Sequence, residues 1–122
     1  MSTPAKPDDL RDLLPLTPAV FHILLALADG EKHGYGIMQE VTAISNGSIK
    51  MGPGTLYGSI KRMLEISLIR ETDERPDPAL DDERRRYYEL TALGKRVLSA
   101  ELQRMESLLN VARTKRFAGG LS

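Results

Sequence analysis

Apolar residues recur at helical spacing in four stretches of the chain and at strand spacing in two. The first helix is expected over residues 17–28, with a hydroxyl N-cap at Thr17, a proline in its first turn and Asp29-Gly30 at its end. Phe21 and Leu25 widen its apolar surface, so this helix is expected to pack on a second surface besides its own core. The main apolar stripe consists of Val20, Ile23, Leu24 and Leu27.

Two further short helices are predicted, separated by a turn that contains glycine. One covers residues 35–44 and ends at Asn46-Gly47, a strong turn signal. The other opens at Gly52-Pro53 and runs to about residue 66. Three short helices joined in this way are typical of a helix-turn-helix core. The expected core positions are Ile37, Val41 and Ile44 in one helix, and Leu56, Ile60, Met63 and Leu64 in the other.

The spacing then changes to that of β-strands. Residues 68–72 and 86–91 are rich in strand-forming residues, with Tyr88 and Leu90 on one face. Between them lies an acidic loop with two prolines, Pro76 and Pro78, which is too long for a tight hairpin turn. A strand pair after a helix-turn-helix core is the winged-helix arrangement.

Thr91 is expected to cap a long last helix that reaches about residue 115. Its apolar residues follow the 4-3-4-3 spacing of a coiled-coil seam. Two heptads are also compatible with a helix that only packs along its own domain, but the first three helices already supply a core. We therefore expect a dimerisation helix, with Phe21 and Leu25 contributing to the same interface. The predicted seam is Leu98, Leu102, Met105, Leu109 and Ala112.

These elements predict a mainly α protein with a small β-wing, a winged helix-turn-helix followed by a long C-terminal dimerisation helix. The expected divisions are an N-terminal tail and short helix over 1–15, with the helix itself at 8–14, and a DNA-binding domain over 16–91. A dimerisation helix over 92–117 and a disordered tail over 118–122 follow. No apolar run is long enough to cross a bilayer and no secretory signal is present, which indicates a cytoplasmic protein.

Composition excludes several kinds of chemistry. The 122 residues include no cysteine, which excludes disulfides and thiolate nucleophiles. The net charge is zero, but charge is segregated: residues 50–70 carry an excess of bases, and residues 71–83 hold seven acids against one arginine. Three arginines, Arg84 to Arg86, follow directly. Overall neutrality therefore does not exclude a basic face for nucleic acid.

The predicted third helix has an exposed side suited to close contact. Gly58 lies opposite the buried stripe, where glycine costs up to about 1 kcal/mol relative to alanine. Such a cost suggests a surface that approaches a partner closely. Tyr57 and Ser59 border this side, and Lys50 precedes the helix. The alternative is that any exposed helix carries bases and that Gly58 is merely tolerated. Thr55, Lys61 and Arg62 flank Gly58.

Several motifs, in order, resemble the PadR family of phenolic-acid-responsive repressors. They are Leu16-Thr17-Pro18, His33-Gly34-Tyr35-Gly36-Ile37, the run from Gly54 to Met63, Leu68-Ile69, and the run from Arg85 to Gly94. The resemblance covers about residues 16–115. It implies a homodimer that binds a palindromic double-stranded operator and usually represses transcription. It also implies that Tyr35 lies near the DNA backbone, that Thr55, Tyr57, Ser59, Lys61 and Arg62 read DNA, and that Arg84, Arg85 and Arg86 approach a minor groove or phosphates.

Two features depart from the family pattern. Family members that bind drugs use an aromatic pair at the dimer interface, and this chain has no tryptophan to supply it. Its wing loop is also longer and more acidic, so phosphate should repel the tip. Whether a small apolar effector binds at the dimer interface stays open, because the same residues also suit a tight interface.

Other functions fit the sequence less well. The two imidazoles, His22 and His33, have no nucleophile or metal-ligand partner at useful spacing, so we predict no enzyme activity, catalytic residue, metal or cofactor. The acids Asp81 to Glu83 are better explained as solvated. A winged helix that contacts only other proteins is the alternative, and salt-sensitive duplex binding distinguishes the two.

Overall fold

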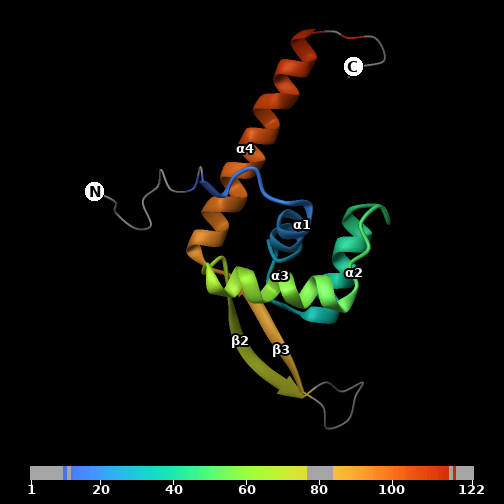
Figure 1. Cartoon of the computed structure of the whole chain (residues 1–122), viewed down its shortest axis with the longest axis vertical. Coiled ribbons are helices and arrows are strands. Elements are labelled where there is room, and N and C mark those ends of the chain that lie inside the picture. Colours follow the sequence, from blue (N-terminus) through green and yellow to red (C-terminus); the bar gives the residue numbers. More distant parts are fainter. Residues whose placement is uncertain (1–9, 11, 77–83, 116, 118–122) are drawn as a thin grey trace, which may run out of the picture.

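A computed structural model of the chain describes residues 10, 12–76, 84–115 and 117; for 73–76, 84 and 85 it describes the backbone alone. Three helices form the centre, a β-hairpin extends to one side, and the last helix projects to the other (Figure 1).

This is the winged-helix fold that the sequence predicted. The elements are α1 (Pro18–Ala26), β1 (Lys32–His33), α2 (Gly34–Ile44), α3 (Pro53–Glu65), β2 (Ile69–Pro76), β3 (Arg84–Leu90) and α4 (Ala92–Lys115).

Helix α1 begins as predicted and ends two residues earlier. The Thr17 hydroxyl oxygen accepts a hydrogen bond from the Val20 N–H at 3.3 Å, which satisfies one free amide of the first turn. The helix ends at Ala26 because Leu27 already caps it and the chain turns toward β1. Ile23 and Leu24 are completely buried, so the predicted stripe is the centre of the core.

The buried faces of α2 and α3 match the prediction except at one end. Ile37 and Val41 of α2 are completely buried, as are Leu56 and Met63 of α3. Ile44, however, is 38% exposed, so its expected core position was wrong. It is the last residue of α2, directly before the C-cap Ser45, where the helix ends.

The sheet is antiparallel with the strand order β1-β3-β2. The two-residue strand β1 was not predicted, because two residues are too few to show a periodicity; it pairs His33 with Tyr87. Strand β2 pairs with β3 from Ile69 opposite Leu90 to Pro76 opposite Arg84. The sequence placed Pro76 in the loop, but the pairing with β3 carries the strand further.

Helix α4 starts directly on the turn between α3 and β2. The Thr91 hydroxyl donates to the Ser67 carbonyl at 2.6 Å, and the Thr91 N–H donates to the Leu68 carbonyl at 3.1 Å. The same hydroxyl oxygen accepts from the Gly94 N–H at 2.9 Å, which confirms the predicted cap. A Cβ at Gly94 would lie 2.0 Å from the Leu68 oxygen, so only glycine fits here.

The two halves of α4 have different surroundings. Val97 and Leu98 are buried in the core of their own chain, so Leu98 does not belong to an exposed seam in the single chain. The C-terminal half of the helix projects away from the other elements (Figure 1). Its apolar side chains there are largely exposed: Leu102, Met105, Leu108, Leu109 and Val111.

The segment before α1 lies against the core. Residues 10, 12 and 13 form a 3₁₀ turn where the sequence predicted a short helix. Leu13 and Leu16 pack partly buried on the core cluster, and the Leu16 N–H donates to the Glu101 carboxylate at 2.9 Å. The tails expected over 1–7 and 118–122 lie outside the described residues.

We predict that Gly94→Ala lowers the free energy of unfolding by about 1–3 kcal/mol, because the new methyl group meets a backbone oxygen that no side-chain rotation can move. Urea denaturation measures the effect. Gly58→Ala is the matched control, since no atom lies within 4 Å of a Cβ there; it should stabilise the fold by up to about 1 kcal/mol. Equal effects of the two changes would contradict this packing.

Candidate DNA-binding surface

One side of α3 faces solvent and carries the residues predicted to read DNA. Thr55, Gly58, Lys61 and Arg62 are exposed, and Ser59 is partly covered at the border. No atom lies within 4 Å of the position of a Cβ at Gly58. The fold therefore does not require this glycine, although it costs stability in a helix. A partner that approaches the helix from outside would explain it.

The start of α3 is also open toward solvent. Gly52 is its N-cap residue and provides no side-chain hydrogen bond to the first turn. The amides of the first turn therefore keep their hydrogen-bonding capacity, and the positive end of the helix dipole is uncovered. Lys50 is exposed just before this end. Free amides and a nearby ammonium are suited to a phosphate group.

Tyr57 connects the exposed side of α3 to the start of α2. A Cβ at Gly34 would lie 2.3 Å from the Tyr57 hydroxyl oxygen, so the buried Gly34 leaves room for the tyrosine. His33 caps α2 through Nδ1, which accepts from the Gly36 N–H at 3.0 Å. Tyr57 is 48% exposed and Tyr35 is 50% exposed. The sequence reading missed this contact; the glycine after His33 was the available signal.

The described side chains of the wing include one paired arginine. Arg86 is exposed but forms an ion pair with Glu71, at 3.6 Å between Nε and Oε2. Arg84 and Arg85 lie in β3, and Arg85 is opposite Arg75 in the register. The loop 77–83, with the acids Asp81 to Glu83, lies outside the described residues.

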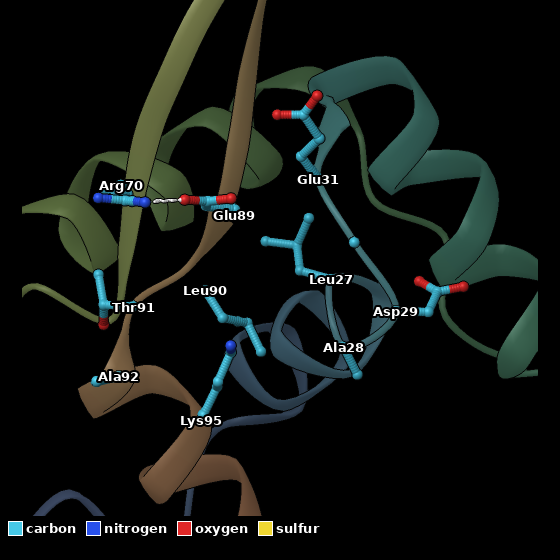
Figure 2. A pocket seen from close by; sticks show the side chains of 11 residues that line it. Leu27, Ala28, Asp29, Glu31, Arg70, Glu89, Leu90, Thr91, Ala92 and Lys95 are labelled. Atoms are coloured by element: carbon cyan, nitrogen blue, oxygen red, sulfur yellow. Dashed lines mark hydrogen bonds and ion pairs between the residues drawn. The ribbon is translucent and has the colours of Figure 1, made fainter.

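A polar hollow of about 740 Å³ lies where the base of the wing meets α4 and the turn after α1 (Figure 2). Several of its charged residues form ion pairs. Arg70 Nε donates to Glu89 at 2.6 Å, as Figure 2 shows, and Asp29 pairs with Lys32 at 2.6 Å. Three of its charged residues, Asp29, Arg70 and Glu89, are therefore already paired.

A smaller, more apolar hollow of about 310 Å³ lies on the face of α4 that carries the predicted seam. Leu98 and Leu102 line it, together with Leu90 and Ala28. Met105 and Leu109 are exposed further along the same helix, Ala112 is half-buried, and Phe21 and Leu25 of α1 are half-buried. The structure therefore leaves most of the predicted interface residues at least partly accessible in the single chain.

The two histidines, for which the sequence predicted no catalytic role, form hydrogen bonds with the backbone of their own helices. His33 is occupied as a helix cap, and His22 Nδ1 lies 2.8 Å from the Pro18 carbonyl oxygen in its own helix. Among the described residues, no group of three or more histidines or acids could hold a metal ion. Within the same residues, no helix is long and apolar enough to cross a membrane.

Comparison with known proteins identifies the family. Residues 23–100 match the model of the transcriptional regulator PadR-like family. The chain belongs to this family. It is a family of transcriptional regulators and not of enzymes, which confirms the prediction made from its motifs.

Two relatives illustrate the range of the family. The chain is 33% identical to the transcriptional regulator Rv3488 of Mycobacterium tuberculosis over 87 residues, which cover 71% of this chain and 75% of that one. It is 35% identical over 86 residues to an uncharacterised 37.1 kDa protein of transposon TN4556 of Streptomyces fradiae. That match covers 70% of this chain and 22% of the relative, so the chain spans about a fifth of the longer protein's length.

Solved structures of the family share the fold. A PadR family regulator of Clostridium difficile matches with a TM-score of 0.67 and 24% identity, over 80% of this chain and 97% of that one. Bacillus subtilis PadR in complex with operator DNA matches with a TM-score of 0.60 and 22% identity, over 68% of this chain and 45% of that one.

We predict that Gly34→Ala displaces the Tyr57 ring, because its methyl group would overlap the hydroxyl. A double-mutant cycle with Tyr57→Ala measures the contact, and we expect a coupling of about 0.5–3 kcal/mol in urea denaturation. Gly36→Ala is the control, since the nearest atom to its Cβ is His33 Cε1 at 3.4 Å. Additive effects for the Gly34 cycle would exclude the contact.

Proposed function

We propose that this PadR-family regulator is a homodimeric repressor that binds a palindromic operator in double-stranded DNA through α3. The observation that carries the proposal is the exposed side of this helix. Gly58 lies at its centre, although no neighbouring atom of the fold requires a glycine there. Lys61 and Arg62 lie one turn further on. A small residue permits close approach, and the two bases provide contacts to guanine edges or phosphates.

The surrounding residues supply contacts of different kinds. The hydroxyls of Thr55, Tyr57 and Ser59 suit phosphates or base edges, and Lys50 with the free first turn of α3 suits a phosphate. Tyr35 lies at the start of α2, beside the Gly34 position that contacts Tyr57. The wing arginines Arg84, Arg85 and Arg86 would approach the minor groove or phosphates.

The family supports this proposal. It is a family of transcriptional regulators, and one solved member, Bacillus subtilis PadR, is in complex with operator DNA. A DNA target also means that the protein works in the cytoplasm. The division into a DNA-binding domain at 16–91 and a dimerisation helix at 92–117 is part of the same proposal.

The first test is binding of the purified chain to duplex DNA. Operators are selected from a pool of random duplexes, and affinity is measured as salt rises; it should fall steeply through counterion release. Lys61→Ala or Arg62→Ala should weaken binding by about 1–3 kcal/mol where the side chain meets a base. Gly58→Ala should also weaken binding although it stabilises the fold, because it blocks close approach.

Glu65→Ala, at the far end of the same exposed helix, serves as the control and should keep its affinity. Unchanged affinity in both Lys61→Ala and Arg62→Ala would mean that the reading face is assigned wrongly. If no duplex binds in a salt-sensitive way, the alternative of a winged helix that contacts only proteins is favoured.

The second test concerns the dimer. Leu102 and Leu109 of α4 are 41% and 38% exposed in the single chain, so a second chain can reach them. Leu102→Asp should yield monomers in light scattering, because a carboxylate in an apolar interface loses its hydration. Ser107→Asp adds a charge at an exposed position of α4 that does not line this hollow, and it should leave the dimer largely intact. An intact Leu102→Asp dimer would contradict the predicted seam.

We also propose that the apolar hollow beside Leu98 and Leu102 accepts a small apolar effector once a second chain closes it. Its volume of about 310 Å³ lies at the lower end of ligand pockets. A panel of apolar aromatic compounds should include ones that raise the melting temperature and change operator affinity. In Ser99→Trp, which fills the rim, both effects should be lost; if no compound acts on the wild-type protein, the residues form a tight interface instead.

A further inference from the structure

Glu101 of α4 is the only charged side chain that is completely buried among the described residues. Burial of a carboxylate costs several kcal/mol unless it is paired and hydrogen-bonded. Both of its oxygens have partners here. Oε1 accepts from Arg104 Nε at 2.6 Å, and Oε2 accepts from Arg104 Nη2 at 3.1 Å and from the Leu16 N–H at 2.9 Å. We call Glu101, Arg104 and the Leu16 amide the Glu101 clamp.

Stability alone does not explain a carboxylate at this position. A buried ion pair is often no more stabilising than an apolar side chain of similar volume, and Val97 and Leu98 already show that α4 packs with apolar contacts. The charge is nonetheless retained in the folded chain, because the hydrogen bonds from Arg104 hold the pKa of Glu101 below its ordinary value. Unlike an apolar contact, the carboxylate forms a directional hydrogen bond, which fixes the position of α4 relative to one particular amide.

The amide that Glu101 binds lies directly before helix α1. Leu16 directly precedes Thr17, the N-cap of α1, and is 85 residues away from Glu101 in the sequence. Helix α1 packs against α2, α3 and α4. The bond therefore ties α4 to the start of the helix around which the DNA-reading core is assembled.

Helix α4 is held at a second point, seven residues earlier. There Gly94 lies against the Leu68 carbonyl, and Thr91 is bonded to Ser67 at the end of α3. At 1.5 Å per residue, Glu101 lies about 10 Å from Gly94 along the helix, and Lys115 lies about 31 Å from Gly94. Two fixed points determine the direction of a rod. A shift of about 1 Å at Glu101 would become about 3 Å at Lys115, close to the rise of one base pair.

We propose that the Glu101 clamp sets the angle between α4 and α3, and thereby the separation of the two α3 helices in the dimer and the half-site spacing that it accepts. Glu101 is thus a positioning residue that need not touch DNA. This inference rests on the proposed homodimer and its operator. Apolar contacts alone would let α4 tilt over its own core, whereas the bond to Leu16 does not.

The experiment measures the distance between the two α3 helices directly. The chain has no cysteine, so Glu65→Cys, at the exposed end of α3, places one spin label on each protomer. Pulsed dipolar spectroscopy of the dimer should give a narrow distance distribution. In Glu101→Met, which lacks the acceptor but keeps a similar length, the distribution should shift by about 3 Å or more, or widen by a similar amount.

Two further variants separate the clamp from general effects. Glu101→Gln keeps an oxygen for the Leu16 amide and should stay close to the wild-type distribution. Arg96→Met removes a charge from an exposed position on the same helix that lines neither hollow, and it should leave the distribution unchanged. A wild-type distribution in a folded Glu101→Met dimer would overturn the proposal.

Spacing is tested on the selected operator with one base pair added or removed at its centre. The wild-type dimer should lose about tenfold or more in affinity, and Glu101→Met clearly less. Absence of any dipolar signal in the wild-type protein would refute the dimer and the clamp's role with it. A changed distance in Glu101→Met without duplex binding would support the clamp's geometry while overturning the DNA-binding function.

Hydrogen exchange in the wild-type protein gives a measurement that needs no variant at Glu101. The Leu16 amide should exchange slowly, because a buried carboxylate holds it. Exchange as fast as in an unstructured peptide would overturn the clamp even if Glu101→Met failed to fold.

Discussion

The contact between the first turn of α4 and the Leu68 carbonyl joins the two parts of the molecule. A backbone oxygen lies where the Cβ of any residue other than glycine would be at position 94, so the two backbones approach as closely as they can. Thr91 adds two hydrogen bonds to the same turn and caps α4. Because α3 ends at that turn, the direction of the last helix depends on the position of the helix proposed to read DNA.

This arrangement bears on how a protein of zero net charge would bind the polyanion that we propose as its partner. The exposed side of α3 carries only Lys61 and Arg62 beyond its polar residues, and Arg86 of the wing is partly balanced by Glu71. Few charges give a modest affinity for each half-site, since phosphate contacts supply most non-specific binding. The dimer that we propose would offer two such surfaces at once, so a fixed separation between them would contribute more to selectivity than any single contact.

Three glycines differ in what lies next to the position that a Cβ atom would occupy. Gly94 is required by a backbone oxygen, and Gly34 by the hydroxyl of Tyr57. Around Gly58 there is open space, so no packing contact among the described residues requires a glycine there. From the sequence only Gly58 drew attention, because its position opposite an apolar stripe is visible from periodicity. The other two depend on residues that are far away in the chain.

The sequence by itself determined the order and type of the main helices and strands, the family, and the side of α3 that faces solvent. These follow from local signals: apolar periodicity, the caps at Thr17 and Thr91, and motifs spread over most of the chain. Tertiary structure alone decided the strand β1, the exposure of Ile44, the contact of Gly34 with Tyr57 and the burial of Glu101. The physical reason is distance along the chain. A carboxylate on an exposed-looking helix becomes buried only when the Leu16 amide arrives from 85 residues away, and no local pattern carries that information.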